Sequence, residues 1–345
     1  MRGGGMRATG RAARARALAL AVLLASPAPA LEVIDPGQGP VPLPAAATGA
    51  RELSGVAWAG GDRYLAVSDD EPALYTLAIT VDRTSGRIRA AAVTARTPLD
   101  QGVDLEGVAY AGDRTVYVSD EDGPAIRRHT VATGASCGAV GVPERFATAR
   151  RNLSLESLAL APDGRALWTA NEEALKGDGP TNQASDGGGT LVRLQRLRTD
   201  AGGRWRPAGQ WTYRVDGMEP FLGRGPSGVV DLAVLPDGTL LVLERAAGVT
   251  GLAGDPPSAQ VGLRSRIYAV DLRGATDTSR LPRLDGTVAA ARKHLLWEGV
   301  FPRHNFEGMA LGPPLENGDR SLVLIADDGN GLDQGLYALR LGPSL

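Results

Sequence analysis

The sequence is short of cysteine, aromatic residues and histidine, and each shortage excludes a kind of structure or site. Cys137 is the single cysteine among 345 residues, so no intrachain disulfide can form, and stability must come from the core or from a bound metal. Aromatic residues make up 5% of the chain, which gives little support to a stacking platform for nucleic-acid bases. The histidines, His129, His294 and His304, show no clustered spacing, which disfavours a zinc site.

The apolar run near the N-terminus, Ala17–Ala25, is too short to span a bilayer, which takes roughly 20 residues. Five arginines precede this run, and Ala28-Pro29-Ala30 follows it. This pattern predicts a secretory signal peptide over residues 1–30, cleaved after Ala30, and a single domain over residues 31–345. The alternative is a retained membrane anchor. We therefore expect a periplasmic or extracellular protein that makes no membrane contact after cleavage.

The net charge becomes more negative once this segment is removed. Removing five arginines and no acidic residue lowers the formal net charge from −2 to −7. An acidic protein is a poor ligand for a phosphate backbone, so we expect no nucleic-acid partner. The sequence also lacks a G-x-S-x-G nucleophile elbow, an H-E-x-x-H zinc motif and a P-loop, which argues against a serine hydrolase of the common type.

The sequence does contain an internal repeat. Five segments share a polar pair, a run of small and apolar residues, a tight turn, an apolar strand and an acidic cluster. They run over residues 52–70, 104–121, 154–172, 228–245 and 305–328. Turn signals such as Gly112-Asp113 and Pro236-Asp237-Gly238 divide each segment, so each unit is predicted to open with an antiparallel hairpin.

Further strands follow each hairpin. A third strand is predicted at Leu74–Ile79, Ala125–Val131, Thr190–Leu197, Arg266–Leu272 and Gly335–Leu341. A fourth is predicted in four units, at Arg87–Ala95, Pro143–Ala149, Gly209–Val215 and Lys293–Val300. The last unit has none before the chain ends, and Leu31–Ile34 could supply it.

Repeated four-stranded units predict an all-β fold, a β-propeller whose ring is closed by the N-terminal strand. Five blades fit the repeat best, and six remain possible if an insertion conceals a degenerate unit. A β-sandwich or two separate β domains are the alternatives. Two inserts, Lys176–Gly189 and Ala246–Leu263, follow the second strand of their units and should project from one rim, or are simply tolerated surface loops.

Acidic residues recur at one end of every hairpin. The start of the first strand lies beside the end of the second, so these residues are predicted to ring one mouth of the channel. The start-of-strand pairs are Glu52/Ser54, Asp104/Glu106, Ser154/Glu156, Gly228/Val230 and Asn305/Glu307. The strand ends carry Asp69, Asp120, Asn171, Glu244 and Asp327, followed by Asp70, Glu121, Glu172, Arg245 and Asp328. Asp231 is one residue out of phase and is predicted to face away from the channel.

Crowded carboxylates repel one another and need protons or a cation. Oxygen ligands in this number suit Ca²⁺, which takes six to eight of them, better than Mg²⁺ or Mn²⁺. We predict that Asp69, Asp120, Glu244, Asp327 and Asp328 are metal ligands. The alternative is that these residues only terminate strands and hydrogen-bond neighbouring backbone.

Basic residues near this rim are few. Arg245 follows Glu244 directly and His304 precedes the last polar pair, so we predict that both contact the substrate. Arg245 could equally balance the charge of the acidic ring.

The order of these motifs resembles a known family. Asp104-Leu-Glu-Gly-Val108, the segment Leu155–Gly164, Leu241-Val-Leu-Glu-Arg245, Asn305-Phe-Glu-Gly-Met309 and Asp327-Asp328 together look like the phytase-like family described as having esterase-like activity. The resemblance covers residues 52–341. It implies an exported propeller with calcium near an acidic channel. Glu106, Glu156, Glu307 and Asp327 are the best matches to the family's acidic positions.

Three functions are compatible with these observations. The first is a metal-dependent hydrolase of phosphate monoesters, acting as a monomer on a small ester, in which Glu106, Glu156 and Glu307 orient or deprotonate water. The second is a non-catalytic, calcium-stabilised propeller that binds a ligand or a protein. The third is a lactonase-like hydrolase. The small number of Lys and Arg residues near this rim argues against phytate itself as the substrate.

Overall fold

The computed structural model describes Met1 and residues 31–44, 48–182, 185, 187–217, 227–253 and 258–342. The predicted signal peptide therefore lies, beyond Met1, outside the described residues. From Leu31 onward the chain forms one unit. No helix in the described ranges is long and apolar enough to cross a membrane.

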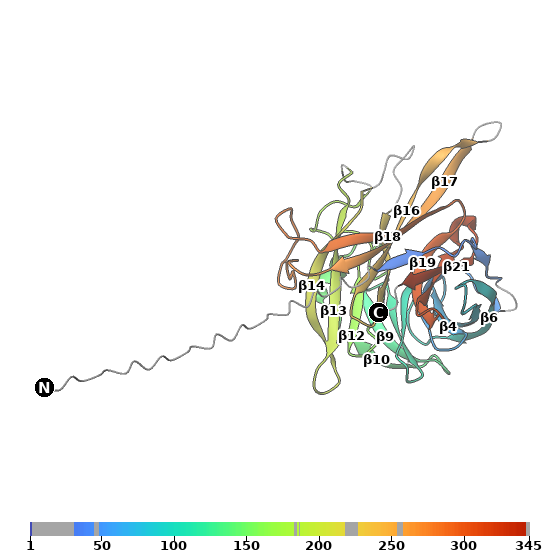
Figure 1. Cartoon of the computed structure of the whole chain (residues 1–345), viewed down its shortest axis with the longest axis horizontal. Coiled ribbons are helices and arrows are strands. Elements are labelled where there is room, and N and C mark those ends of the chain that lie inside the picture. The colour runs from blue at the N-terminus through green and yellow to red at the C-terminus, as the bar shows by residue number, and fades with distance from the viewer. Residues whose placement is uncertain are drawn as a thin grey trace. The chain divides into compact units, whose positions relative to one another are not determined.

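The described strands form five antiparallel sheets, each a blade (Figure 1). Blade 1 holds β3 (Leu53–Trp58), β4 (Arg63–Ser68), β5 (Ala73–Val81) and β6 (Ile88–Pro98). Blade 2 holds β7 (Leu105–Tyr110), β8 (Thr115–Asp120), β9 (Ala125–Thr130) and β10 (Ser136–Val140). Blade 3 holds β11 (Ala159–Leu160), β12 (Ala166–Ala170), β13 (Thr190–Thr199) and β14 (Trp205–Val215). Blade 4 holds β15 (Ser227–Val234), β16 (Leu240–Ala253), β17 (Ser258–Asp271) and β18 (Arg292–Phe301).

Blade 5 is built from both ends of the domain. It holds β19 (Asn305–Pro314), β20 (Arg320–Asp327) and β21 (Gly335–Gly342), and β1 (Glu32–Ile34) pairs with β21 as the fourth strand. A short strand, β2 (Val41–Pro42), also pairs with β21. The prediction that the N-terminal strand closes the ring is confirmed.

The first strands of the blades line the axis and contact one another in a closed circuit. β3 contacts β7, β7 contacts β11, β11 contacts β15, β15 contacts β19, and β19 contacts β3. Five blades in a closed ring make a β-propeller, as the repeat predicted, and the described residues contain no sixth sheet. Each interface between neighbouring blades buries its own apolar cluster, so the core is divided into five wedges.

One predicted strand is wrong. Residues 143–149 were expected to form the fourth strand of blade 2, but they contain the 3₁₀ helix η2 (Glu144–Thr148). The fourth strand is instead β10, which comes directly after a tight turn from β9. The apolar character of the segment reflects the fully buried side chain of Phe146, which packs between blades 2 and 3.

Small residues bring the first strands close together. A Cβ on Gly107 would lie 2.6 Å from the amide nitrogen of Leu158, and one on Gly308 would lie 2.3 Å from the carbonyl oxygen of Ser54. Blade 4 carries Asp231 at the corresponding position of its repeat. Its carboxylate accepts hydrogen bonds from the amides of Met309 at 2.6 Å and of Leu158, on either side of blade 4. Asp231 therefore reaches toward the neighbouring first strands and joins blade 4 to the blades on either side.

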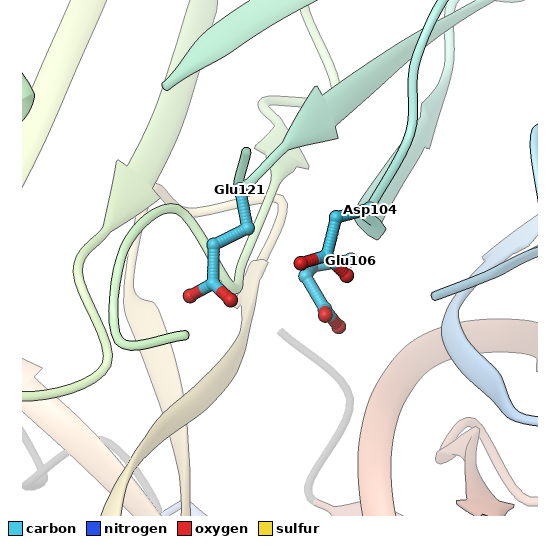
Figure 2. A group of neighbouring side chains, drawn as sticks. All are labelled: Asp104, Glu106 and Glu121. Carbon is cyan, nitrogen blue, oxygen red and sulfur yellow. The ribbon is translucent and has the colours of Figure 1, made fainter. Parts of the chain in front are cut away.

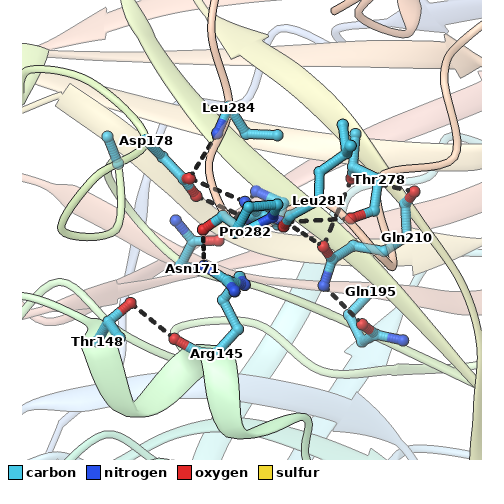
Figure 3. A network of polar contacts seen from close by, with 12 residues as sticks. Arg145, Thr148, Asn171, Asp178, Gln195, Gln210, Thr278, Leu281, Pro282 and Leu284 are labelled. Carbon is cyan, nitrogen blue, oxygen red and sulfur yellow. Dashed lines mark hydrogen bonds and ion pairs between the residues drawn. The ribbon is translucent and has the colours of Figure 1, made fainter.

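A buried network of hydrogen bonds and an ion pair connects the first insert, Lys176–Gly189, to blade 3 (Figure 3). Arg193 is fully buried and donates to both carboxylate oxygens of Asp178, at 2.6 and 2.8 Å. The same guanidinium donates to Gln210 at 2.6 Å, and Asp178 also accepts from the amide of Leu284, in the connection between β17 and β18. The network therefore joins the insert, blade 3 and blade 4.

The second insert, Ala246–Leu263, continues the hairpin of β16 and β17 beyond its sheet (Figure 1). The pairing between the two strands extends to Ala253 and Ser258. A second short 3₁₀ helix, η4 (Gly329–Gly331), follows β20.

Candidate functional site

The mouth of the channel gathers glutamates from several blades. Glu106 on β7, Glu307 on β19 and Glu156 just before β11 are all buried, with 7%, 8% and 7% of their surface exposed. They are close enough for Glu307 to raise the pKa of Glu106, and for Glu106 to raise the pKa of Glu156. The three glutamates that we predicted to be catalytic are thus brought together. The opposite end of the channel is lined by uncharged residues, among them Trp58, Tyr110, Leu160, Val234 and Leu311, so the two ends differ in charge.

Asp104, Glu106 and Glu121 form the tightest group. One carboxylate oxygen from each residue lies within 4.8 Å of the others (Figure 2). Asp104 and Glu106 lie side by side at the start of β7, and Glu121, which directly follows β8, faces them across a narrow gap. Such an arrangement of three carboxylates can hold a divalent cation, because it offers several oxygen ligands at short range.

Carboxyl groups here are hydrogen-bonded to one another. Glu106 contacts Asp104, and Glu156 contacts Glu121. Two carboxylates cannot share a hydrogen bond unless one of them carries a proton, so this cluster requires either protons or a cation. Ser54 adds a hydrogen bond by donating to Glu106 at 2.5 Å.

Burial and mutual repulsion shift the acidity of the whole cluster. Burial, reinforced by neighbouring carboxylates, raises the pKa of Glu106 and Glu156 well above the ordinary value. Burial also raises the pKa of Glu172 to about 8, although Arg245 opposes that shift. The pKa of Asp69 rises to about 8 through burial and the charge of Asp327.

Arg245 is the cation of the cluster. It donates to Glu172 at 3.2 Å and to Glu307 at 2.7 Å, and these carboxylates raise its pKa above the ordinary arginine value despite burial. Blade 4 therefore contributes a positive charge, whereas the first strands of blades 2 and 5 contribute Glu106 and Glu307. The structure places Arg245 as a charge-balancing bridge between blades 3 and 5.

Three predicted metal ligands lie on blades 1 and 5. The Oδ1 atom of Asp69 is buried and has no hydrogen-bond partner. Asp327 accepts from the amide of Gly329 at 2.8 Å, and burial raises its pKa. Asp328 accepts from the amide of Glu52 at 2.5 Å.

Two other predicted ligands lie in separate networks. Asp120 is 1% exposed and pairs with Arg127 at 2.5 Å. Glu244 accepts from Tyr213 and Lys293, both at 2.5 Å, between blades 3 and 4. Their hydrogen-bonding capacity is therefore directed to these partners.

His304, a predicted substrate contact, packs away from the carboxylates. Its ring stacks on Phe306 with centroids 5.8 Å apart. Burial lowers the pKa of His304, and its charged neighbours are Asp333 and Arg303. The structure thus brings Arg245 to the cluster and places His304 against the side of blade 5.

The ligand set predicted from sequence omitted Asp104, Glu121 and Glu172. All three belong to the repeated acidic columns, so the signal was present. Glu121 directly follows the end of β8, and Glu172 lies two residues beyond the end of β12. Each is one residue beyond the column that holds Asp120 and Asn171. Which of two successive side chains faces the axis depends on the bulge in each hairpin, as between Leu105 and Val108.

A cleft of about 680 Å³ opens beside the cluster. Its lining includes the acidic residues Asp69, Asp104 and Glu121 and the basic residues Arg150, Arg151 and Lys176. An anionic ligand can therefore meet positive charge in the same cleft that exposes the carboxylates.

Comparison with known proteins identifies one family. The family model for phytase-like proteins, described as "esterase-like activity of phytase", matches residues 48–330. The search of curated sequences gave no match.

Solved structures with similar folds are distant. The PQQ-bound aldose sugar dehydrogenase from Streptomyces coelicolor is 17% identical, with 91% of this chain and 98% of that chain covered at a TM-score of 0.40. A putative glucose dehydrogenase from Thermus thermophilus is 16% identical, with 91% and 100% covered, also at 0.40. A streptogramin B lyase is 10% identical, with 91% and 98% covered at 0.34.

Proposed function

Since this chain belongs to the phytase-like family, we propose that it is a metal-dependent ester hydrolase that acts on phosphate monoesters at the acidic channel mouth. The observation that carries the proposal is the Asp104, Glu106 and Glu121 cluster, whose oxygens lie within 4.8 Å of one another beside a cleft that basic residues also line. Calcium is the cation that the all-oxygen ligand set suits best.

The residues at the mouth fit such a cation. Ser154 lines the same cleft, is 1% exposed, and its Oγ atom has no hydrogen-bond partner. The hydrogen-bonded carboxyl pairs Glu106–Asp104 and Glu121–Glu156 are a second sign, because each pair is repulsive when both members are ionised. A cation satisfies both the orphaned oxygen and the excess negative charge.

We assign the roles as follows. Asp104, Glu106 and Glu121 hold the cation, which when bound neutralises charge on the substrate and makes water more acidic. Arg150, Arg151 and Lys176, which line the same cleft, bind and orient the anionic ester. Their task is electrostatic, because the transferred group carries negative charge throughout the reaction.

Two further buried glutamates position the ligands. Glu156 hydrogen-bonds Glu121 and keeps it facing Asp104 and Glu106. Glu307 is held by Arg245, so its carboxylate is fixed in place and its charge is balanced. We propose that Glu156 also holds a proton at its carboxyl oxygen and can pass it toward the cleft through Glu121.

Hydrolysis of an aryl phosphate and of an aryl acetate by chelator-treated protein, with and without Ca²⁺, Mg²⁺ or Mn²⁺, tests the proposal. We expect phosphatase turnover that Ca²⁺ restores, and a loss of at least about 100-fold in Glu121→Gln and Glu106→Gln. Asp163→Asn, in an exposed turn at the far end of a blade 3 hairpin, is the matched control and should keep full activity.

Three other outcomes separate the alternatives. Turnover of the acetate or of a lactone without the phosphate would move the assignment to carboxylic esters. Turnover that is indifferent to chelation would remove the metal from the proposal. An absence of all turnover, with the melting temperature still raised by Ca²⁺, would favour a calcium-stabilised binding protein.

We further propose that the protein is exported and processed after Ala30, because a basic segment and a short apolar run precede that position. The mass of the protein recovered outside the cytoplasm of a producing bacterium gives the test. A mature N-terminus at Leu31 is expected. Retention of the full chain in the cytoplasm or the inner membrane would contradict the proposal.

A further inference from the structure

We propose that the channel mouth holds a second divalent-cation site, formed by Asp69, Asp327 and Asn305 where blades 1 and 5 meet, separate from the Asp104, Glu106 and Glu121 group on blade 2. The proposal extends the hydrolase proposed above to two cations. It is tested by binding alone, so it can fail while hydrolysis is confirmed, or be confirmed when hydrolysis fails.

The main support for this second site is the side chain of Asn305. Only 8% of the residue is exposed, and its Oδ1 atom has no hydrogen-bond partner. Its amide nitrogen donates toward Asp327 at 3.4 Å and also toward Glu307. These two carboxylates fix the orientation of the amide, because only the NH₂ group can donate to them. The carbonyl oxygen of Asn305 is thereby left in the acidic cluster without a donor.

Asp69, on blade 1, also has a buried carboxylate oxygen, Oδ1, without a hydrogen-bond partner. Its strongest charged neighbour is Asp327, whereas Asp104 affects it less than Asp327, Glu52 and Glu307 do. The charge of Asp327 on blade 5 therefore acts on Asp69 of blade 1, which also lines the cleft that holds Asp104 and Glu121.

A chain of backbone contacts holds the two sides together. The amide of Asp69 donates to the carbonyl of Glu52 at 3.2 Å, and the amide of Glu52 donates to Asp328 at 2.5 Å. Asn305 and Asp327 are directly paired between β19 and β20. The amide of Gly329 donates to Asp327 at 2.8 Å and fixes the direction of that carboxylate.

The chemistry of this group selects hard cations. Two carboxylates and an amide carbonyl are oxygen ligands of the kind that Ca²⁺ takes from proteins. The group contains no nitrogen or sulfur ligand, which disfavours zinc and copper. Each unpartnered oxygen also carries the energetic penalty of a buried acceptor without a donor, which a bound cation removes.

The test is calcium titration of the chelator-treated mature protein by calorimetry, with Tb³⁺ luminescence as an independent count. We expect two cations per chain. Asn305→Ala and Asp69→Asn should each weaken one binding step by roughly 10- to 100-fold and leave the other step unchanged. Glu121→Gln should weaken the other step instead.

Two further variants keep the result interpretable. Asn305→Asp retains an oxygen ligand at the same place and should keep both steps, so loss of binding in Asn305→Ala alone cannot be a folding defect. Asp163→Asn is the surface control. A single cation per chain, or two cations that Asn305→Ala and Asp69→Asn leave at full affinity, would overturn the proposal.

Discussion

At the scale of single residues, Asp231 shows how one side chain can replace a glycine in the repeat and join three blades. Its carboxylate accepts hydrogen bonds from the amides of Leu232, Met309 and Leu158 in a fully buried position. Burial raises its pKa well above the ordinary value despite these bonds. The residue therefore satisfies backbone groups of neighbouring first strands that have no sheet partner on that side.

Replacing Asp231 tests this role. Asp231→Ala leaves the buried amides of Met309 and Leu158 without an acceptor, and we expect a loss of about 3–5 kcal/mol in the free energy of unfolding. Asp231→Asn keeps one oxygen acceptor and should lose less than half as much. Denaturant unfolding of both variants gives the comparison, and equal losses would show that the hydrogen bonds contribute little.

A second prediction at the scale of single residues concerns the ion pair of Arg193. Its guanidinium is fully buried, and Asp178 is its ion-pair partner at 2.6 Å. Asp178→Ala leaves a buried charge without a partner, which costs about 3–5 kcal/mol. The measurement is again denaturant unfolding. Asp163→Ala serves as the exposed control and should stay within about 0.5 kcal/mol of the parent protein.

The orientation of single side chains was the feature that the sequence predicted least well. The repeated acidic columns predicted that one channel mouth is acidic, and Glu106, Glu156 and Glu307 do meet there. The columns could not show which of two successive residues faces the axis. Asp120 pairs with Arg127 while its neighbour Glu121 joins the cluster, because the partner strands of each blade determine where a side chain is satisfied.

At the scale of strands, the close approach of the first strands depends on glycine. In Gly308→Ala, the new Cβ would lie 2.3 Å from the carbonyl oxygen of Ser54 and 2.6 Å from Ile325, so the backbone must move. We expect a loss of about 1–3 kcal/mol in the free energy of unfolding. Gly141→Ala meets no atom within 4 Å and should be nearly neutral. Thermal unfolding of the two variants under identical conditions is the measurement, and equal melting temperatures would contradict the packing argument.

The strands themselves were largely predictable, because hairpin turns and period-two alternation are local signals. The prediction failed at residues 143–149, where Phe146 is buried by a 3₁₀ turn rather than by a strand. A short apolar segment does not reveal whether it is buried in a sheet or beneath one. β11 is likewise shorter than its repeat suggested, since only Ala159 and Leu160 form the strand.

At the scale of the whole molecule, the ring and the acidic mouth depend on each other. The closed ring holds carboxylates from four blades near one axis, and β1 completes the ring by pairing with β21. The repeat count and the unassigned N-terminal strand were enough to predict this closure. The balance of charge at the mouth was not predictable, because it depends on distances between blades that share no local sequence signal.

This balance leads to a pH prediction for the metal-free protein. The folded cluster holds protons that the unfolded chain releases, since the pKa of Asp69 and of Glu172 is about 8 in the fold, against ordinary values near 4. The folded state therefore binds more protons than the unfolded state between about pH 4 and pH 8, and its stability falls as the pH rises through that window. The slope is at most about 1.4 kcal/mol per pH unit for each such group.

His304 acts in the opposite direction and sets the lower pH limit for the measurement. Burial lowers the pKa of His304, so its contribution to stability rises with pH, but only up to its unfolded value near 6.5. Melting temperatures of chelator-treated protein between pH 7 and pH 8.5 are therefore expected to fall as the pH rises. Added Ca²⁺ should remove most of this slope, because a cation bound by the carboxylates replaces the protons and stabilises the folded state more at high pH. A metal-free melting temperature that rises across this range would mean that the carboxylates are ionised in the fold without a cation, and the cluster would then have no electrostatic need for calcium.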